Sequence, residues 1–220
     1  MGSINFDIHK IFVEGITDQA CIEKILELKY GISFPHNGIA ADKAIINCGG
    51  WNKLKTSLFL IDEYRKDMGG KNLVIFDADG KNNEGGYQKR YNQLMSVAGE
   101  LNIKFEIFLF PNNSADGILE DFYCSCFKKE MKFFEDCWQG MLLCFEQNNN
   151  FDLKLNSPSV YDKVYSYVDL FEEYKTVEYK NTKTKRHYFD MGIWEFDFEH
   201  NDNLQKLISF IEDCGIVTNE

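Results

Sequence analysis

The nine residues NLVIFDADG, Asn72 to Gly80, give the clearest indication of the fold, because an apolar run in them leads directly into two carboxylates. Residues 73–76 are apolar at every position, which is typical of a strand that is covered on both faces. Asp77 and Asp79 end this run abruptly, and Asp and Gly are residues that favour turns. The segment therefore predicts a buried strand whose carboxyl end carries two acids.

A short apolar run followed by a helical pattern occurs on both sides of this segment. Apolar runs occupy residues 9–15, 43–50, 71–80 and 103–111. The segments with helical character that follow them are residues 17–31, 51–70, 86–101 and 114–134. Four strand-and-helix units in succession predict an α/β fold with a mainly parallel, four-stranded sheet flanked by helices.

The pattern changes after residue 127, where longer helical segments replace the strands. Residues 160–174 have helical character, and residues 202–214 place Leu204, Leu207, Ile208 and Ile211 on one apolar face. We therefore predict an α/β domain at residues 5–127. A mainly helical C-terminal extension at residues 128–220 is expected to pack on the same domain.

The composition is that of a globular protein. Its 220 residues are 44% hydrophobic, which is enough to form a substantial core. Apolar runs stay far short of the roughly 20 residues that cross a bilayer, and the N-terminus lacks the pattern of a signal peptide. We therefore expect a cytoplasmic protein that makes no membrane contact.

Charge and cysteine content narrow the classes of function. The net charge of −11 disfavours a protein that coats nucleic acid through charge alone, because Lys and Arg normally drive phosphate binding. A metal enzyme is compatible with this charge, since acids around divalent cations present a positive face to phosphate. The seven cysteines lack the spacing of a disulfide framework, so we expect reduced thiols. Cys124 and Cys126 are too close together for the usual zinc site.

The acids after the strands are candidate metal ligands. On an extended segment, Asp77 and Asp79 point the same way, so both can reach one hard cation such as Mg²⁺. Glu14 follows the first predicted strand, which can lie close to the third. Three converging acids repel one another unless a metal or a proton is bound. Asp18 is a further candidate, although an acid in the first turn of a helix also stabilises the helix dipole.

These residues resemble the Toprim domain, the catalytic fold shared by topoisomerases, primases, recombination-associated proteins and overcoming-lysogenization-defect nucleases. That family is marked by a Glu after its first strand and an Asp-x-Asp after its third, here Glu14, Asp77 and Asp79. The resemblance is carried by IFVEGITDQACIEKIL (11–26), INCGGWNKL (46–54) and LVIFDADG (73–80). FLFPNNSADGILEDFY (108–123) and DKVYSY (162–167) are similar to segments of uncharacterised stand-alone bacterial Toprim-like proteins.

The resemblance implies a Rossmann-like Toprim fold and a role for each acid. Asp77 and Asp79 would hold magnesium or manganese, and Glu14 would act as a general acid/base or as a second metal ligand during phosphodiester chemistry. In the nuclease branch of the family, Asp18 and Glu120 stand where acids help to hold a second metal. The chain lacks the DNA-gate, zinc-binding and polymerase-accessory segments of other branches, which disfavours strand passage and primer synthesis.

Two further segments are candidate phosphate-binding sites. Gly49 and Gly50 precede a predicted helix that carries Lys53, and helix N-termini bind phosphate, although a glycine pair is more often only a tight turn. The charged segment 179–188 is either a solvated hairpin tip or an arm that binds a nucleic-acid backbone. Its candidate residues are Lys183, Lys185 and Arg186.

Three functions remain open from the sequence. The first is magnesium-dependent phosphodiester chemistry on nucleic acid or nucleotide, as in a nuclease. The second is a non-catalytic module that binds nucleotide, nucleic acid or a partner protein such as an ATPase. The third is a phosphatase of the haloacid dehalogenase type, whose Asp-x-Asp motif is similar to residues 74–80. Lys81 and the position of the motif on the third strand depart from that family, and Lys81 and Gln88 also exclude a calcium-binding loop.

Overall fold

The computed structural model describes residues 2–32, 34, 44–56, 63–80, 85–148, 156–171 and 192–219. The chain divides into two compact units. The first comprises Met1–Phe122 and Asp197–Glu220, and the second comprises Tyr123–Phe196. The closing segment of the chain therefore groups with the N-terminal unit, whereas the sequence suggested a single boundary between residues 127 and 128.

A parallel sheet forms the centre of the first unit. Its strand order is β3-β2-β4-β5, and every pairing is parallel, as the sequence predicts. Val13 of β2 lies opposite both Asn47 of β3 and Ile75 of β4, and Asp77 of β4 lies opposite Phe110 of β5. The strands are β2 (Lys10–Val13), β3 (Ile45–Asn47), β4 (Asn72–Asp77) and β5 (Glu106–Phe110).

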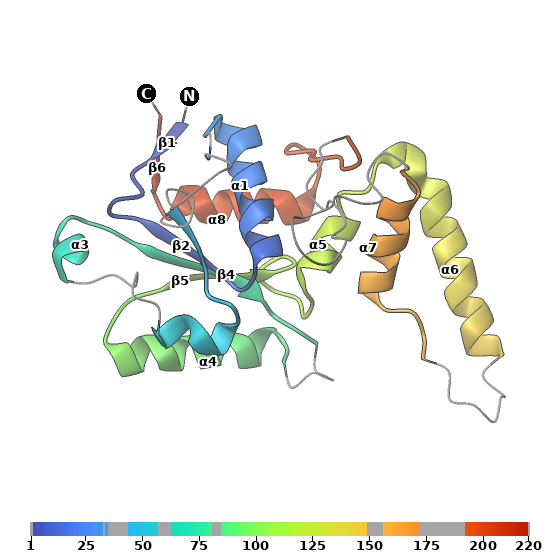
Figure 1. Ribbon diagram of the computed structural model, residues 1–220, viewed down its shortest axis with the longest axis horizontal. Coiled ribbons are helices and arrows are strands. Elements are labelled where there is room, and N and C mark those ends of the chain that lie inside the picture. The colour runs from blue at the N-terminus through green and yellow to red at the C-terminus, as the bar shows by residue number, and fades with distance from the viewer. Residues whose placement is uncertain are drawn as a thin grey trace, which may run out of the picture. The chain divides into compact units, whose positions relative to one another are not determined.

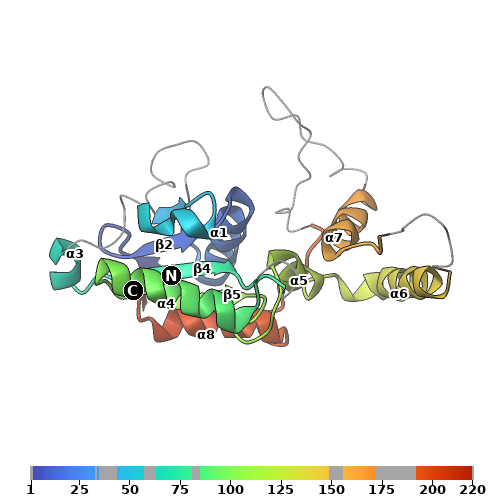
Figure 2. The same cartoon turned by 90° about the horizontal axis from the view of Figure 1, so that it is seen from below.

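One face of this sheet is covered by η1 (Trp51–Thr56) and by α4 (Tyr87–Leu101). Leu54 of η1 and Leu94 of α4 belong to the same buried cluster as Phe12, Val74 and Phe76 of the strands. Figure 2, which looks at this face, shows α4 lying alongside β4 and β5. The predicted helix at residues 86–101 is thereby confirmed.

The opposite face carries α1 (Ile16–Tyr30) and α8 (Asp202–Asp213). Phe108 of β5 points to this face, because successive side chains of a strand alternate and its neighbours Ile107 and Leu109 belong to the α4 cluster. The ring of Phe108 lies 5.5 Å from that of Phe210 of α8. Figure 1 shows α1 and α8 together on this side of the strands. Helices on both faces of a parallel sheet make a Rossmann-like arrangement.

The two ends of the chain pair with each other, which the sequence does not predict. β1 (Gly2–Ile4) and β6 (Val217–Asn219) form a separate antiparallel pair, and Figure 1 shows the termini side by side. Strands of three residues leave too short a pattern to be recognised. The buried residues of α8, in contrast, are the predicted Leu204, Leu207, Ile208 and Ile211.

Two segments predicted as single helices are divided in the structure. Residues 51–70 contain η1 and the short α3 (Glu63–Asp67), and residues 57–62 between them lie outside the described residues. Residues 114–134 contain α5 (Leu119–Cys124), η3 (Lys129–Met131) and the start of α6. All seven cysteines are reduced thiols that form no disulfide bond, as the sequence predicts.

The second unit is built around stacked aromatic rings. It contains α6 (Lys132–Gln147) and α7 (Val160–Asp169). The rings of Phe127 and Tyr167 are stacked 3.9 Å apart, and the ring of Trp194 lies 5.2 Å from that of Tyr167. The hydroxyl group of Tyr167 donates a hydrogen bond to the carbonyl oxygen of Ile193 at 2.7 Å. In the described part of the chain, no helix is both long and apolar enough to span a membrane.

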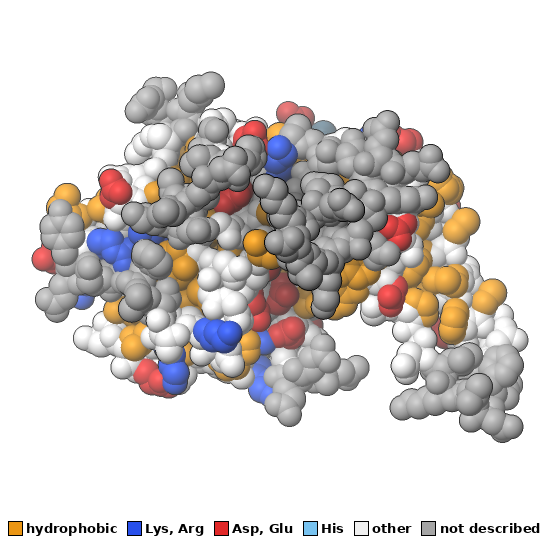
Figure 3. Space-filling model, viewed as in Figure 1, with side chains coloured by type: hydrophobic (Ala, Val, Ile, Leu, Met, Phe, Trp, Pro, Cys, Tyr) orange, Lys and Arg blue, Asp and Glu red, His pale blue; other side chains and the backbone are white. Residues whose placement is uncertain are grey.

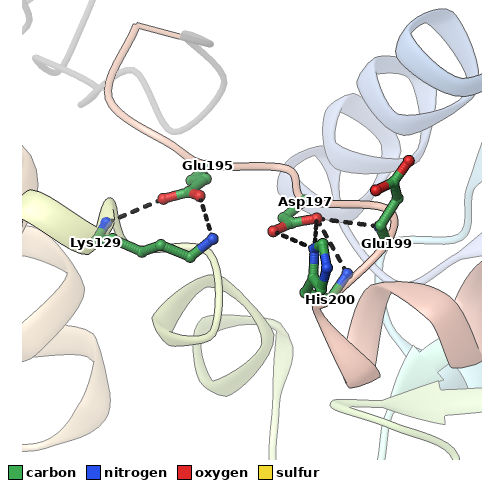
Figure 4. A network of polar contacts seen from close by, with 5 residues as sticks. All are labelled: Lys129, Glu195, Asp197, Glu199 and His200. Atoms are coloured by element: carbon green, nitrogen blue, oxygen red, sulfur yellow. Dashed lines mark hydrogen bonds and ion pairs between the residues drawn. The ribbon is translucent and has the colours of Figure 1, made fainter.

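Two carboxylates near the end of the chain each organise a local turn within their own unit (Figure 4). Glu195 accepts a hydrogen bond from the backbone N–H of Lys129 at 3.0 Å and forms an ion pair with the same lysine at 2.9 Å. Asp197 accepts hydrogen bonds from the backbone N–H groups of Glu199 and His200 at 3.1 and 3.0 Å. The turn at Asp197 leads into α8, whose first helical residue is Asp202.

Candidate functional site

Four acidic side chains interact at the carboxyl end of the parallel sheet. Asp77 ends β4, Glu14 follows β2, and Asp18 and Glu120 lie in the first turns of α1 and α5. We call Glu14, Asp18, Asp77 and Glu120 the carboxylate cluster. The sequence predicts all four as site residues. Figure 3 shows acidic side chains, set back from the surface, near the end of β4.

Asp77 is the centre of the electrostatic interactions in this cluster. Burial raises the pKa of Asp77 well above its usual range, and the negative charges of Asp18, Glu14 and Glu120 raise it further. Its Oδ1 atom accepts a hydrogen bond from the backbone N–H of Leu119 at 2.8 Å, which acts in the opposite direction. This bond joins the end of β4 to the start of α5, so it places Glu120 beside the strand.

Asp18 serves the helix with one oxygen atom and the cluster with the other. Its Oδ2 atom accepts a hydrogen bond from the backbone N–H of Gly15 at 3.1 Å, an ordinary helix-start contact. Its Oδ1 atom is buried without a hydrogen-bond partner. Asp18 is only 7% exposed, and burial together with the charges of Glu14 and Glu120 raises its pKa to about 7. Helix capping therefore explains the position of the Oδ2 atom of Asp18 but not that of its Oδ1 atom.

Glu14 lies between the sheet and η1. Its Oε1 atom accepts a hydrogen bond from the backbone N–H of Trp51 at 3.4 Å, and its Oε2 atom is buried without a partner. Burial raises the pKa of Glu14 and the charge of Asp79 adds to the rise, while Arg90 acts in the opposite direction. Glu120 is also only 7% exposed, and burial raises its pKa to about 7.

The backbone at the glycine pair before η1 forms hydrogen bonds within the protein. The backbone N–H of Gly50 donates to the carbonyl oxygen of Glu14 at 3.0 Å, and the next N–H binds the Glu14 carboxylate. Gly49 and Gly50 both have positive φ angles, of 71° and 126°. Lys53 is exposed, and Figure 3 shows Lys and Arg side chains over η1. A phosphate cradle at Gly49, Gly50 and Lys53 stays a prediction, and Lys183, Lys185 and Arg186 lie outside the described residues.

Asp79 has a different environment from Asp77. Strand β4 ends at Asp77, and Asp79 has a left-handed backbone conformation with φ of 61°. The argument that both acids project alike from an extended segment is therefore wrong at Asp79. Its Oδ2 atom forms an ion pair with Nη2 of Arg90. Asp79 as a metal ligand stays a prediction.

Glycine at position 85 allows the chain to pass close over Asp79. A Cβ atom at Gly85 would overlap the Cβ atom of Asp79 and lie 3.0 Å from the carbonyl oxygen of Ala78. The next backbone N–H, that of Gly86, donates to the same carbonyl oxygen at 2.9 Å. The turn that carries Asp79 is therefore fixed by backbone atoms on both sides.

We expect Gly85→Ala to lower the free energy of unfolding by about 2 kcal/mol, because the added methyl group overlaps Asp79 and the adjacent backbone. Gly99→Ala is the matched control in α4, where an added Cβ meets nothing within 4 Å. Helix propensity predicts that this control gains up to about 1 kcal/mol. Urea unfolding of both variants measures the difference, and equal stabilities would contradict the close packing at residue 85.

Arg90 and Trp51 are the neighbours of the cluster that the sequence analysis did not single out. Arg90 is only 5% exposed, and its guanidinium group lies 4.5 Å from the centre of the Trp51 ring. A signal for Arg90 was present, because it occupies the buried face of α4 together with Leu94, Val97 and Ala98. A cation at a core-facing helical position needs a partner, which here is Asp79.

Residues 8–170 match the model of a family described as "Protein of unknown function (DUF3226)". The chain belongs to this family. A search of the curated proteins and a search of the solved structures each gave no match. The DUF3226 match spans the whole carboxylate cluster as well as Asp79 and Arg90, and it ends just after α7.

The DUF3226 description assigns no activity, so the chemistry must be argued from the side chains. Among the residues that the structure describes, no three His, Cys, Asp or Glu side chains have the arrangement of a ready metal site. The cluster does combine four buried or half-buried carboxylates, two of which have an oxygen atom without a partner. Such a group can hold protons, as the raised pKa values indicate, or bind a cation.

Proposed function

We propose that this protein is a metal-dependent phosphodiesterase of the nuclease type, with a Toprim-like fold, that uses the carboxylate cluster as its catalytic centre. The observation that carries the proposal is a group of four mutually repelling acids, two buried and two half-buried, at the carboxyl edge of a parallel sheet. Ligand sites in open α/β sheets occur at this edge. Buried charges without compensation cost stability, and functional sites are where such costs are retained.

The donor chemistry of the cluster fits a hard divalent cation. Every candidate ligand is a carboxylate oxygen, and Mg²⁺ and Mn²⁺ prefer oxygen ligands. Oε2 of Glu14 and Oδ1 of Asp18 are buried acceptors without a hydrogen-bond partner, which a cation would satisfy. Since the described side chains do not form a ready three-ligand site, binding requires small rotations of the carboxylates.

Each residue of the cluster has a role in the proposed reaction. A bound divalent cation would supply charge stabilisation to the phosphate and activate a water molecule. Asp77, whose carboxylate accepts a hydrogen bond from the backbone N–H of Leu119, would hold the cation together with Asp18 and Glu120. Burial raises the pKa of Glu14, which supports its proposed role as the group that accepts and returns a proton.

The Toprim resemblance supports this proposal at Glu14 and Asp77, whose charges interact as that family's pattern implies. The same interaction disfavours a phosphatase of the haloacid dehalogenase type, in which Asp77 would act as a nucleophile apart from Glu14. The proposed substrate is nucleic acid or nucleotide, and the proposed location is the cytoplasm. A module that binds such a ligand, or a partner such as an ATPase, without cleaving anything is the rival function.

The test is a cleavage assay with single-stranded DNA, double-stranded DNA, RNA and bis(p-nitrophenyl) phosphate, in magnesium, manganese or EDTA. We expect hydrolysis of at least one substrate that needs the metal, and a loss of about a hundredfold or more in Glu14→Gln. Glu100→Gln, which changes an exposed acid on α4, is the matched control and keeps wild-type activity.

Two outcomes would contradict the proposed function. Equal hydrolysis by wild type and Glu14→Gln would remove Glu14 from the reaction. No hydrolysis of any substrate by a folded protein that binds manganese would favour the non-catalytic module.

A further inference from the structure

Arg90 is a buried cation at the edge of the carboxylate cluster. It lies in the first turn of α4, and its charge lowers the pKa of Glu14, so the guanidinium group is within electrostatic reach of the cluster. Its side chain is 6% exposed and packs over the ring of Trp51. The backbone N–H of Trp51 in turn binds Glu14, which links Arg90 to the cluster through one residue.

The guanidinium group is only partly satisfied by the protein. Nη2 binds Asp79, and Nη1 donates to Oε1 of Gln93 at 3.2 Å. Nε is buried and has no hydrogen-bond partner. A guanidinium group donates through all three nitrogen atoms, and a buried donor without an acceptor costs about 1–3 kcal/mol. Arg90 therefore keeps donor capacity that a ligand oxygen can fill.

Asp79 has the properties of a residue that positions Arg90. Its left-handed backbone is fixed by the N–H of Gly117, which donates to the carbonyl oxygen of Asp79 at 3.1 Å. Gly85 passes directly over it. Because the turn is fixed, the ion pair holds the guanidinium group in one place instead of leaving it to move with the helix surface.

We propose that Arg90 is the phosphate-binding residue of this site and that Asp79 positions it instead of binding the metal. The planar fork of a guanidinium group matches two oxygen atoms of a phosphate, which is why Arg is common at such sites. A phosphate that lies beside Arg90 is also within electrostatic reach of Glu14, the proposed acid/base of the cluster. The inference rests on the proposed function for its substrate, but phosphate binding and metal binding are measured separately from cleavage.

The experiment titrates inorganic phosphate into the full chain by calorimetry, in magnesium and in EDTA, with sodium chloride holding the ionic strength constant. Wild type is compared with Arg90→Gln, with Arg90→Lys and with Asp79→Asn, and Mn²⁺ affinity is measured in the same samples. Arg90→Lys keeps a cation beside Asp79 but lacks the planar guanidinium group. It therefore replaces Arg90→Gln as the test if that variant does not fold.

We expect phosphate to bind the wild type, Arg90→Gln to weaken this binding by about tenfold or more, and Arg90→Lys to weaken it severalfold. Mn²⁺ affinity should stay within about twofold in the Arg90 and Asp79 variants, because neither residue binds the metal.

Three results would overturn this inference, and they differ from a failure of the proposed function. No phosphate binding by the wild type in either buffer, or equal phosphate affinity in Arg90→Lys and wild type, would remove Arg90 from the role. A loss of Mn²⁺ affinity of about tenfold or more in Asp79→Asn would show that Asp79 supports the metal site and not only Arg90. The proposed function itself fails if the wild type binds no Mn²⁺, whatever the phosphate titration gives.

Discussion

Asp77→Asn is expected to lower kcat/KM for phosphodiester hydrolysis by about a thousandfold or more. Loss of the metal would remove several kcal/mol of transition-state stabilisation, and about 1.4 kcal/mol corresponds to a factor of ten. Asn keeps an oxygen atom that can accept the hydrogen bond from the N–H of Leu119, so the junction of β4 and α5 should stay intact. The change removes the charge while preserving the local structure.

The control for this variant is Asp136→Asn on α6. Asp136 is an exposed acid whose ion pair with Lys132 is 3.3 Å long, and it has no role in the site. The kcat/KM of Asp136→Asn should match that of the wild type. An Asp77→Asn variant that is folded, by circular dichroism, and retains more than about a tenth of the wild-type rate would contradict the role of Asp77.

The second large effect concerns stability and pH. In EDTA, the free energy of unfolding should fall as the pH rises from about 4 to about 8. Asp18 and Glu120 have pKa values near 7 in the folded protein, above the ordinary values of 3.8 and 4.5. At pH values between the ordinary and the raised pKa values, the folded state binds more protons than the unfolded state. Stability is therefore greatest at the acidic end of this range and is lost as these carboxylates ionise.

The size of the effect follows from the shift at Asp18. Since one pKa unit corresponds to about 1.4 kcal/mol, the rise from 3.8 to about 7 corresponds to about 4 kcal/mol. For a chain of this length, that is a change in Tm of roughly 10 °C between pH 4 and pH 8.

Asp18→Asn tests the assignment of this pH dependence. The variant removes one buried ionisable group, so its Tm should exceed that of the wild type by the largest margin at pH 8 and by a smaller margin at pH 5. Magnesium should raise the wild-type Tm at pH 8 more than that of the variant. Scanning calorimetry measures both effects, and a wild-type Tm that rises from pH 5 to pH 8 in EDTA would contradict the raised pKa values.

The sequence predicts the central sheet well because its strands and helices differ strongly in pattern. The run at residues 73–76 is buried on both faces, and α4 and α8 carry regular apolar stripes. The pairing of β1 with β6 is not predictable in this way, because it joins residues more than 200 positions apart through strands of three residues. The division of residues 114–134 among α5, η3 and the start of α6 likewise leaves no break in the apolar pattern.

The site is predictable where it depends on strand ends and less so where it depends on turns. Glu14 and Asp77 follow neighbouring parallel strands, so their proximity follows from topology. Asp79 lies in a left-handed turn that depends on Gly85, and its ion pair depends on a helix that begins after that turn. Local sequence spacing cannot give the direction of the Asp79 side chain. Arg90, in contrast, could have been recognised from its helical spacing with Leu94 and Val97.

The central claim is that the carboxylate cluster binds a divalent cation. Titration of Mn²⁺ followed by electron paramagnetic resonance tests it most directly, because free and bound Mn²⁺ are counted without any substrate. We expect the wild type and Asp136→Asn to bind Mn²⁺ equally, and Asp77→Asn to bind it at least about tenfold more weakly. A folded wild type that leaves all Mn²⁺ free, or an Asp77→Asn variant with unchanged affinity, would contradict it.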